Sequence, residues 1–197
     1  MKFIFPFFLL VFAQTAQGQK DWQHWSDSLR TTYANPETTI MSAKEMEGFK
    51  GLIFFPYNPV SIVKARFKRV KKGREFMMKT STERTPVYKV YGILTFTLDG
   101  KKQKLELYQN VDAKRKPGYE DYLFLPFTDE TGGTESYGGG RYLDLRISDV
   151  KKEMTLDFNF CYNPYCAYSA KYSCPVPPAQ NHITAPVRAG VAYEQKQ

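Results

Sequence analysis

Alternation of apolar and polar residues is the feature that most constrains this chain. From Val63 to Lys68, apolar side chains alternate with Lys and Arg, and the run Val87 to Leu98 ends with Leu and Phe alternating with Thr. Asp99-Gly100 follows and predicts a tight hairpin turn that leads into a returning strand through Leu105 and Leu107. A period of two places successive side chains on opposite faces of a strand, so antiparallel β structure is predicted.

Shorter runs predict further strands. They are Leu52 to Phe55, Arg74 to Lys79, Tyr122 to Phe127, Arg141 to Ile147, Met154 to Phe160 and a last short strand at Val187. We expect the strands that begin at Arg141 and at Met154 to form a hairpin around residues 148–153. The strand at 63–68 has a basic outer face, which we interpret as an edge strand whose Lys side chains prevent aggregation. Strand alternation already explains these charges, so no nucleic-acid partner is predicted.

Two short helices are expected before the strands. Trp22, Trp25 and Leu29 follow the possible capping residue Asp21 at helical spacing. A second helix is indicated by the capping box that begins at Ser42. After residue 161, repeated Pro residues make regular structure improbable. The predicted fold is therefore mainly β: an antiparallel β barrel or sandwich with two short N-terminal helices and an irregular C-terminal loop region.

Residues 1–18 have the pattern of a secretory signal peptide. Lys2 is followed by an apolar run to Ala13, and Ala16 and Gly18 supply small residues before a cleavage site. The run is shorter than the roughly 20 residues that span a bilayer. We therefore predict an exported protein, periplasmic or extracellular, whose residues 19–197 form a single β-rich domain without a transmembrane segment.

The chain is basic, with a formal net charge of +8. This balance favours anionic partners such as glycans, phosphate-rich surfaces or a membrane face. A solvated basic surface explains it equally well, because the Lys and Arg residues are spread over several segments.

Three cysteines, Cys161, Cys166 and Cys174, lie close together in the sequence. In an oxidising compartment a bridge between Cys166 and Cys174 is expected, and it would stabilise an irregular loop by about 2–3 kcal/mol. Metal binding, a nucleophilic Cys166 acting with His182, and free thiols are the alternatives. Cys161 follows the core face of its predicted strand, so we expect it to be an odd, buried or half-buried thiol.

Two segments concentrate the residues that could carry a function. The Gly-rich loop, residues 127–141, combines five Gly with Asp129 and Arg141, and its backbone N–H groups could hold a carboxylate or phosphate. The Tyr/Asn-rich loop, residues 162–181, offers Tyr rings suited to stacking on sugars or peptides. In the alternative interpretation, both loops are internal parts of the fold whose polar side chains satisfy their own backbone.

Known hydrolytic motifs are absent from the sequence. It contains neither Gly-x-Ser-x-Gly nor His-Glu-x-x-His. Asp129 and Asp157 could act as a pair of carboxylates if their strands were adjacent. With only His24 and His182 as imidazole ligands, no metal site and no cofactor are predicted.

The C-terminal motifs resemble a known family. They are Phe-Thr-Asp-x-Thr-x-Gly from Phe127, Tyr-Gly-Gly-Gly-Arg-Tyr-Leu-Asp-Leu from Tyr137, Leu-Asp-Phe-Asn-x-x-Tyr-Asn-Pro-Tyr-Cys-Ala-Tyr-Ser from Leu156, and Tyr-Ser-Cys-Pro-x-Pro-Pro-x-x-Asn from Tyr172. This set is similar to the bacterial domain-of-unknown-function family sixteen-eighty-four. Cys161 departs from the family, which usually has a small residue there, and Val191-Ala192 stand where it has Glu-Lys. The resemblance implies no established activity.

The prediction is an exported protein that binds a small polar or anionic ligand where the two loops meet. The alternatives are a hydrolase that uses carboxylates or Cys166, and loops with a purely structural role. The candidate ligand-binding residues are Asp129, Thr131, Tyr137, Gly139, Arg141, Asp157, Asn159, Tyr162, Asn163 and Asn181.

Overall fold

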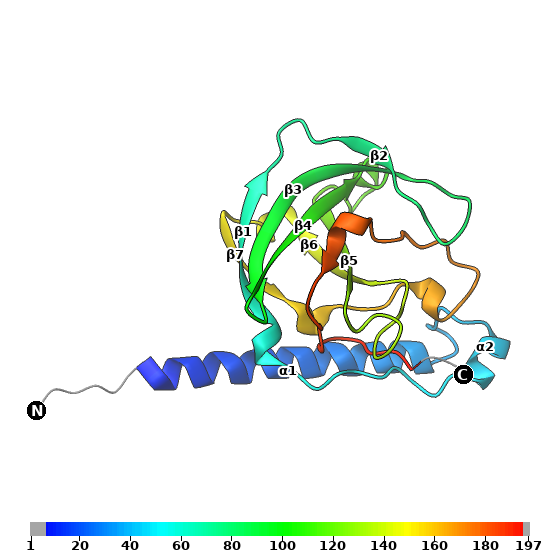
Figure 1. Cartoon of the computed structure of the whole chain (residues 1–197). Helices are drawn as coiled ribbons and strands as arrows, with labels where there is room; N and C mark the ends of the chain where they lie inside the picture. Colours follow the sequence, from blue (N-terminus) through cyan, green and yellow to red (C-terminus); the bar gives the residue numbers. More distant parts are fainter. Residues whose placement is uncertain (1–6, 195–197) are drawn as a thin grey trace, which may run out of the picture.

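The computed structural model describes the backbone of residues 7–194 and the side chains from residue 17 onward (Figure 1). The α-helices are α1 (Phe7–Ala34) and α2 (Ala43–Glu47). The strands are β1 (Ile62–Arg69), β2 (Glu75–Met77), β3 (Val87–Leu98), β4 (Lys101–Asn110), β5 (Tyr122–Asp129), β6 (Arg141–Arg146), β7 (Glu153–Asp157) and β8 (His182–Ile183). Short 3₁₀ turns lie at Pro59–Ser61, Ala113–Arg115, Ile147–Asp149, Phe158–Phe160, Tyr165–Ala167 and Ala179–Asn181.

The strands form one curled, mainly antiparallel sheet that makes a half-barrel (Figure 1). Its order is β6-β5-β4-β3-β1-β7, with β2 paired to β3 and β8 paired in parallel to β5. The predicted hairpin is confirmed: β3 and β4 are joined at Asp99-Gly100, and both residues have positive φ. The predicted barrel or sandwich is thus an open half-barrel.

The hairpin predicted between β6 and β7 is wrong. These strands lie at opposite edges of the sheet, and β7 pairs with β1 through Val63 and Leu156. A 3₁₀ turn follows β6 directly, and the Asp149 carboxylate accepts a hydrogen bond from the Arg146 backbone at 2.7 Å. This turn leads the chain away from β6 instead of reversing it beside β6.

Strand β1 is not an edge strand, which corrects a second expectation. It pairs with β3 on one side and with β7 on the other. Its Lys and Arg side chains therefore do not protect an open edge.

Other boundaries moved by a few residues. Strand β7 ends at Asp157, where the carboxylate accepts the Asn159 N–H and begins a 3₁₀ turn. The expected strand near Phe54 is a single bridge to Val191. The last strand is β8, at residues 182–183 and not at Val187.

The main core lies inside the curl. Alternate residues of β1, β3, β4 and β5 point inward, including Val63, Leu94, Leu105 and Leu125. The C-terminal segment closes this core with Ile183, Ala185, Val187 and Ala189, all fully buried. Each large apolar side chain buried in this way stabilises the fold by about 1.5–3 kcal/mol.

A second apolar cluster packs on the opposite face of the sheet. Leu107 belongs to the main core whereas the next residue, Tyr108, belongs to the second cluster, and Leu123 and Phe124 divide in the same way. Met78, after β2, and Tyr162 of the Tyr/Asn-rich loop cover this cluster. The sheet is therefore apolar on both faces where the two loops meet it.

Helix α1 runs along the base of the half-barrel (Figure 1). It begins at Phe7 and not near Asp21, whose carboxylate instead accepts a hydrogen bond from Gln17 within the helix at 2.7 Å. The predicted apolar face is confirmed, since Trp22 packs on Phe54 and Trp25 on Phe160.

Helix α2 is also confirmed, with both hydrogen bonds of the Ser42–Glu45 capping box.

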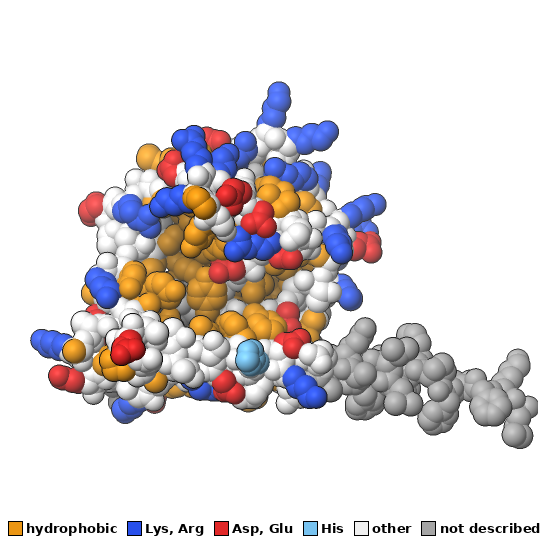
Figure 2. Space-filling model, turned by 180° about the vertical axis from the view of Figure 1, so that it is seen from behind, with side chains coloured by type: hydrophobic (Ala, Val, Ile, Leu, Met, Phe, Trp, Pro, Cys, Tyr) orange, Lys and Arg blue, Asp and Glu red, His pale blue; other side chains and the backbone are white. Residues whose placement is uncertain are grey.

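Seen from behind, hydrophobic side chains gather in a hollow above α1 (Figure 2). Within the described residues, no helix is both long and apolar enough to cross a membrane. The side chains of most of the predicted signal peptide lie outside the described residues.

Candidate functional site

The two ends of the Gly-rich loop form a buried ion pair. Arg141 Nη2 lies 2.8 Å from Asp129 Oδ2, and the two side chains are 0% and 2% exposed. The backbone N–H and the hydroxyl of Thr131 donate to Asp129 Oδ1 at 2.9 and 2.7 Å. Burial alone would raise the pKa of the Asp129 carboxyl, but Arg141 and these hydrogen bonds hold it below its usual value.

Arg141 also holds the C-terminal segment. Its guanidinium donates to the carbonyl oxygens of Val187, at 2.6 Å, and Ala189, at 2.7 Å. The guanidinium is closed to solvent, and its two terminal nitrogens both donate to protein acceptors. The geometry at Asp129, Thr131 and Arg141 matches the structural interpretation of this loop.

The Asn159 side chain plays a similar internal role. Its amide accepts from the Asn58 backbone N–H at 2.7 Å and donates to the Asn58 carbonyl at 3.0 Å. The Asp157 carboxylate accepts from the Asn159 side chain at 2.8 Å, and burial raises the pKa of that carboxyl. Asp129 forms its own ion pair elsewhere, so the two Asp residues serve separate networks.

The Asn181 side chain connects β4 and β5, which pair with each other over a short length. The register of β4 and β5 contains one residue pair, Tyr108 with Phe124. The Asn181 amide accepts from the Glu106 N–H and donates to the Glu106 carbonyl, both at 2.9 Å, and it donates to the Pro126 carbonyl at 2.8 Å. The side chain thus replaces the missing ladder between these strands.

The two loops do meet, as predicted. Gly140 has a φ of +88°, and a Cβ there would lie 2.6 Å from Pro177 of the Tyr/Asn-rich loop. Six of the ten candidate residues are buried: Asp129, Thr131, Arg141, Asn159, Asn163 and Asn181. The partly exposed members are Tyr137, Gly139, Asp157 and Tyr162. The contact surface is therefore largely an internal joint, with Tyr137 on its accessible side.

A pocket lies beside this joint. It has a volume of about 650 Å³ and takes its walls from the α2 region, the Gly-rich loop, the Tyr/Asn-rich loop and the last described residues. Its lining residues are Met41, Glu45, Gly48, Phe49, Lys50, Gly51, Ile53, Thr134, Ala167, Tyr168, Ala192, Tyr193 and Glu194. We call it the rim pocket.

Aromatic rings connect the parts of the rim pocket. The Tyr193 ring lies 6.0 Å from Tyr168 and 5.2 Å from Tyr137. Tyr168 in turn contacts Phe49 and, from α1, Tyr33. The Tyr168 hydroxyl accepts a hydrogen bond from Asn163 at 2.8 Å. The pocket is therefore walled by rings that are fixed by neighbours from three separate segments.

Comparison with known proteins places the chain in a family. The sequence profile of DUF1684, described as a protein of unknown function, matches residues 47–192. The chain belongs to the DUF1684 family. Residues 47–192 include both loops and most of the rim pocket.

A solved structure shares the fold. The solution NMR structure of an uncharacterized protein from gene locus rrnAC0354 of Haloarcula marismortui is 32% identical, with a TM-score of 0.70. The match covers 94% of this chain and 99% of that one. No curated protein matches the chain. The comparisons establish the family and the fold.

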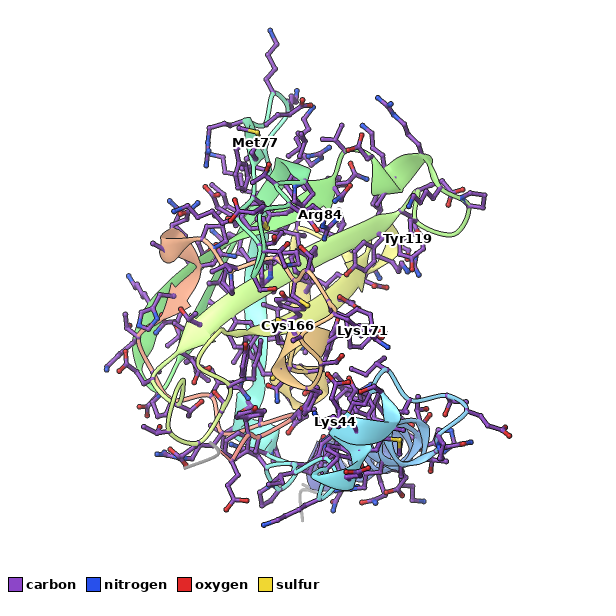
Figure 3. The ribbon with its side chains drawn as sticks, turned by 90° about the vertical axis from the view of Figure 1, so that its right-hand side faces the viewer. Lys44, Met77, Arg84, Tyr119, Cys166 and Lys171 are labelled. Atoms are coloured by element: carbon purple, nitrogen blue, oxygen red, sulfur yellow. The ribbon has the colours of Figure 1, made fainter. Side chains whose placement is uncertain are left out.

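The disulfide predicted in this DUF1684 protein is not present. Cys166 and Cys174 are free thiols, and the Cys174 sulfur instead accepts the backbone N–H of Cys166 at 3.2 Å. Cys161 is fully buried, as expected of the odd thiol, and burial raises its pKa to about 11. Figure 3 shows Cys166 between Arg84 above and Lys44 of α2 below, with Lys171 near it in the view.

Cys166 is half-buried and lies beside the Tyr137 hydroxyl. The Tyr137 hydroxyl lies 4.0 Å from its sulfur. The Cys174 thiol lowers the Cys166 pKa to about 6, with further help from the hydroxyls of Ser81 and Tyr137, although burial opposes this shift. The proton of the pair is held by Cys174, whose pKa is raised. The two shifts have opposite directions, which favours Cys166 as the more acidic thiol of the pair.

One carboxylate was missed by the sequence analysis. Asp144, on β6, accepts hydrogen bonds from the hydroxyls of Tyr122, at 2.6 Å, and Tyr162, at 2.8 Å. The carboxylate stays exposed to solvent while it accepts these two hydrogen bonds. The alternation in β6 could have indicated that Asp144 points away from the core. Its Tyr partners come from other segments and carry no local signal.

Within the described residues, no three His, Cys, Asp or Glu side chains are grouped as metal ligands. His182 contacts Glu130 at 2.9 Å and Thr128 at 3.0 Å instead. Cys166 and Cys174 have no third ligand of these types in that part of the chain.

Proposed function

We propose that this DUF1684 protein binds a small polar ligand in the rim pocket and that it does so after export. One observation carries the proposal: the two loops, α2 and the C-terminal segment jointly enclose a volume of about 650 Å³. That volume is within the usual range for sites of small molecules. Because Arg141 is buried, the polar contacts to the ligand would come from residues other than those that the sequence pattern favoured.

The lining defines the chemistry of the ligand. The rings of Phe49, Tyr168 and Tyr193 offer flat apolar faces, which suit sugars and other ring-shaped polar molecules. The Glu45 carboxylate is committed to the Ser42 backbone and hydroxyl, at 2.7 and 2.8 Å. Lys50 is then the cation available for an acidic group on the ligand.

Two buried polar atoms lie behind this wall, on residues that do not line the pocket. Asn163 Oδ1 and Ser169 Oγ have no hydrogen-bond partner among the described residues. Asn163 donates to the Tyr168 hydroxyl through its other amide atom, so it acts directly behind a lining ring. Buried polar atoms without a protein partner are usually satisfied by ordered water.

The test is NMR titration of the purified protein with a panel of neutral sugars, sugar acids and amino acids. We expect at least one compound to cause saturable shifts at Gly48, Thr134 and Tyr193. Tyr193→Ala should weaken that binding, whereas Tyr119→Ala, an exposed ring outside the pocket, should leave it unchanged. Shifts confined to other residues, or none with the whole panel, would refute a ligand site of this class here.

Thiol chemistry at Cys166 is a second candidate function. It is favoured by the group of Cys166, Cys174, Ser81 and Tyr137, in which the partly accessible Cys166 sulfur lies 4.0 Å from the Tyr137 hydroxyl and its pKa is lowered. A thiolate in such a site is a nucleophile. Iodoacetamide treatment of the native protein followed by peptide mapping tests it: Cys166 should be modified first and Cys161 last. Equal labelling of Cys166 and Cys174 would contradict a selectively activated thiol.

A further inference from the structure

The cations on the outer face of β1 do not protect a sheet edge, contrary to the prediction from the sequence. Lys64 and Arg66 project from a strand that is paired on both sides. Protection of an exposed edge therefore does not account for them. Another role for these cations must come from the surface that they form with the neighbouring strands.

Two cross-strand rows make up this surface. The first row runs Glu153, Arg66, Thr95 and Lys104. The second contains the pairs Thr155–Lys64 and Thr97–Lys102, which lie side by side because Ala65 pairs with Phe96. We call these eight residues the basic face. All eight side chains are exposed, and four are cations against one acid. The face thus concentrates positive charge on β7, β1, β3 and β4.

The register places these cations at regular spacing. β1 and β4 are separated by β3, which puts their equivalent positions about 10 Å apart, and residues two apart on one strand are about 7 Å apart. Lys64, Arg66, Lys102 and Lys104 mark the corners of this rectangle. The hydroxyls of Thr95 and Thr97 lie between them. A shallow groove of about 1190 Å³ follows the same residues.

Internal contacts leave most of this charge available. Arg66 and Glu153 are 4.0 Å apart with side chains 71% and 79% exposed, and such pairs contribute little. Lys64 Nζ donates to the Thr155 hydroxyl at 3.1 Å. Among the described residues, no carboxylate lies within 4.0 Å of Lys102 or Lys104.

We propose that the basic face binds an anionic polysaccharide, a chain of sugar units carrying carboxylate or sulfate groups. Regularly spaced cations match repeated charges along a polymer, and the Thr hydroxyls match sugar hydroxyls. None of the eight side chains of the face is aromatic, and Phe96, which lies between Thr95 and Thr97, is buried in the core, so the face offers no ring for stacking nucleic-acid bases. No outward side chain of the face is a large apolar group that would insert into a membrane.

This surface is independent of the rim pocket. Its residues come from β1, β3, β4 and β7, whereas the rim pocket is formed by the α2 region, the two loops and the C-terminal segment. Failure of one proposal leaves the other unaffected.

Binding of polygalacturonate, measured by isothermal titration with the purified protein, tests the proposal. The face variant is Lys64→Gln, Lys102→Gln and Lys104→Gln. The control variant has the same net charge but changes exposed Lys residues elsewhere: Lys44→Gln, Lys116→Gln and Lys171→Gln. Figure 3 shows Lys44 and Lys171 on the side of the molecule that carries α2 and Cys166.

We expect the face variant to bind about tenfold more weakly than the control variant, and binding of both to weaken as salt is added. Dextran, a neutral polymer, should not bind. Equal losses in the two variants would overturn the proposal, because they would show an effect of net charge alone. Tighter binding to phosphatidylglycerol vesicles or to a single-stranded oligonucleotide would also overturn it, in favour of a membrane or nucleic-acid surface.

Discussion

Arg141 donates its hydrogen bonds to the protein itself: to Asp129 and to three carbonyl oxygens of the C-terminal segment. In the sequence, an Arg that follows three Gly resembles an anion site. In the fold, the same residue closes the core beneath residues 187–191. The distinction is one of burial, which the residue types at this position do not reveal.

Replacement of Arg141 by Met should therefore destabilise the protein strongly. The Asp129 carboxylate would be left buried without its partner, and loss of one member of such a pair costs about 3–5 kcal/mol. Urea unfolding monitored by circular dichroism measures the loss. The control is Arg188→Met, in an exposed pair with Glu135 at 2.7 Å, where we expect less than about 1 kcal/mol. Similar losses in both variants would contradict a structural role specific to Arg141.

The reactivity of Cys166 should depend on pH. Only the thiolate reacts with iodoacetamide, so the rate should rise with pH and reach half its maximum near the pKa of about 6. An ordinary thiol would reach it near pH 8.5. Cys174→Ala removes the strongest donor and should move the midpoint to higher pH. A midpoint that is unchanged in this variant would show that Cys174 does not activate Cys166.

At the scale of elements, Asn181 shows how a side chain can replace a strand ladder. The sequence predicts an irregular loop around Asn181 and a ligand role for its side chain. The structure places its amide between β4 and β5, where it makes three hydrogen bonds to their backbones. The C-terminal region is irregular, yet it holds two strands of the sheet together.

Asn181→Ala should loosen the joint between β4 and β5. Removal of three buried hydrogen bonds to the backbone is expected to cost about 2–4 kcal/mol in unfolding free energy. Hydrogen exchange should show faster exchange of the Glu106 amide, which donates to Asn181. The neighbouring exposed residue provides the control, since Gln180→Ala should have a small effect. Unchanged protection of Glu106 in the Asn181 variant would exclude the proposed bridge.

For the whole molecule, the proposed export requires that the mature chain keep its fold. Trp22, Trp25 and Tyr33 of α1, which pack on Phe54, Phe160 and Phe49, all follow the predicted cleavage site. Gly18 lies just before that site and contacts Tyr57. Cleavage would thus remove few of the described contacts.

We predict that the exported protein begins at Gln19, as measured by N-terminal sequencing or mass spectrometry. Its unfolding free energy should lie within about 1 kcal/mol of that of the full chain, the range of a change at few contacts. Gly18→Leu places a large residue before the cleavage site and should block processing. A Met1 terminus on wild-type protein outside the cell membrane, or a mature chain that fails to fold, would contradict the prediction.

The local sequence was sufficient to predict the elements that are stabilised by interactions between near neighbours in the chain. The Asp99-Gly100 turn and the alternation on both sides of it specify the β3–β4 hairpin, because the turn conformation and the side-chain period act within a few residues. The Ser42–Glu45 capping box is satisfied within one turn of α2 for the same reason. The C-terminal motifs likewise identified the family, since they are contiguous strings.

Tertiary structure alone decided which segments meet and which side chains are buried. β7 follows β6 in the chain but pairs with β1, about 90 residues earlier, and this choice changes the Lys side chains of β1 from edge protection to a continuous basic face. Arg141, Asn159 and Asn181 became internal because their partners come from distant segments. Long-range pairing depends on burying the whole apolar surface at once, and the pattern of any one segment does not contain that information.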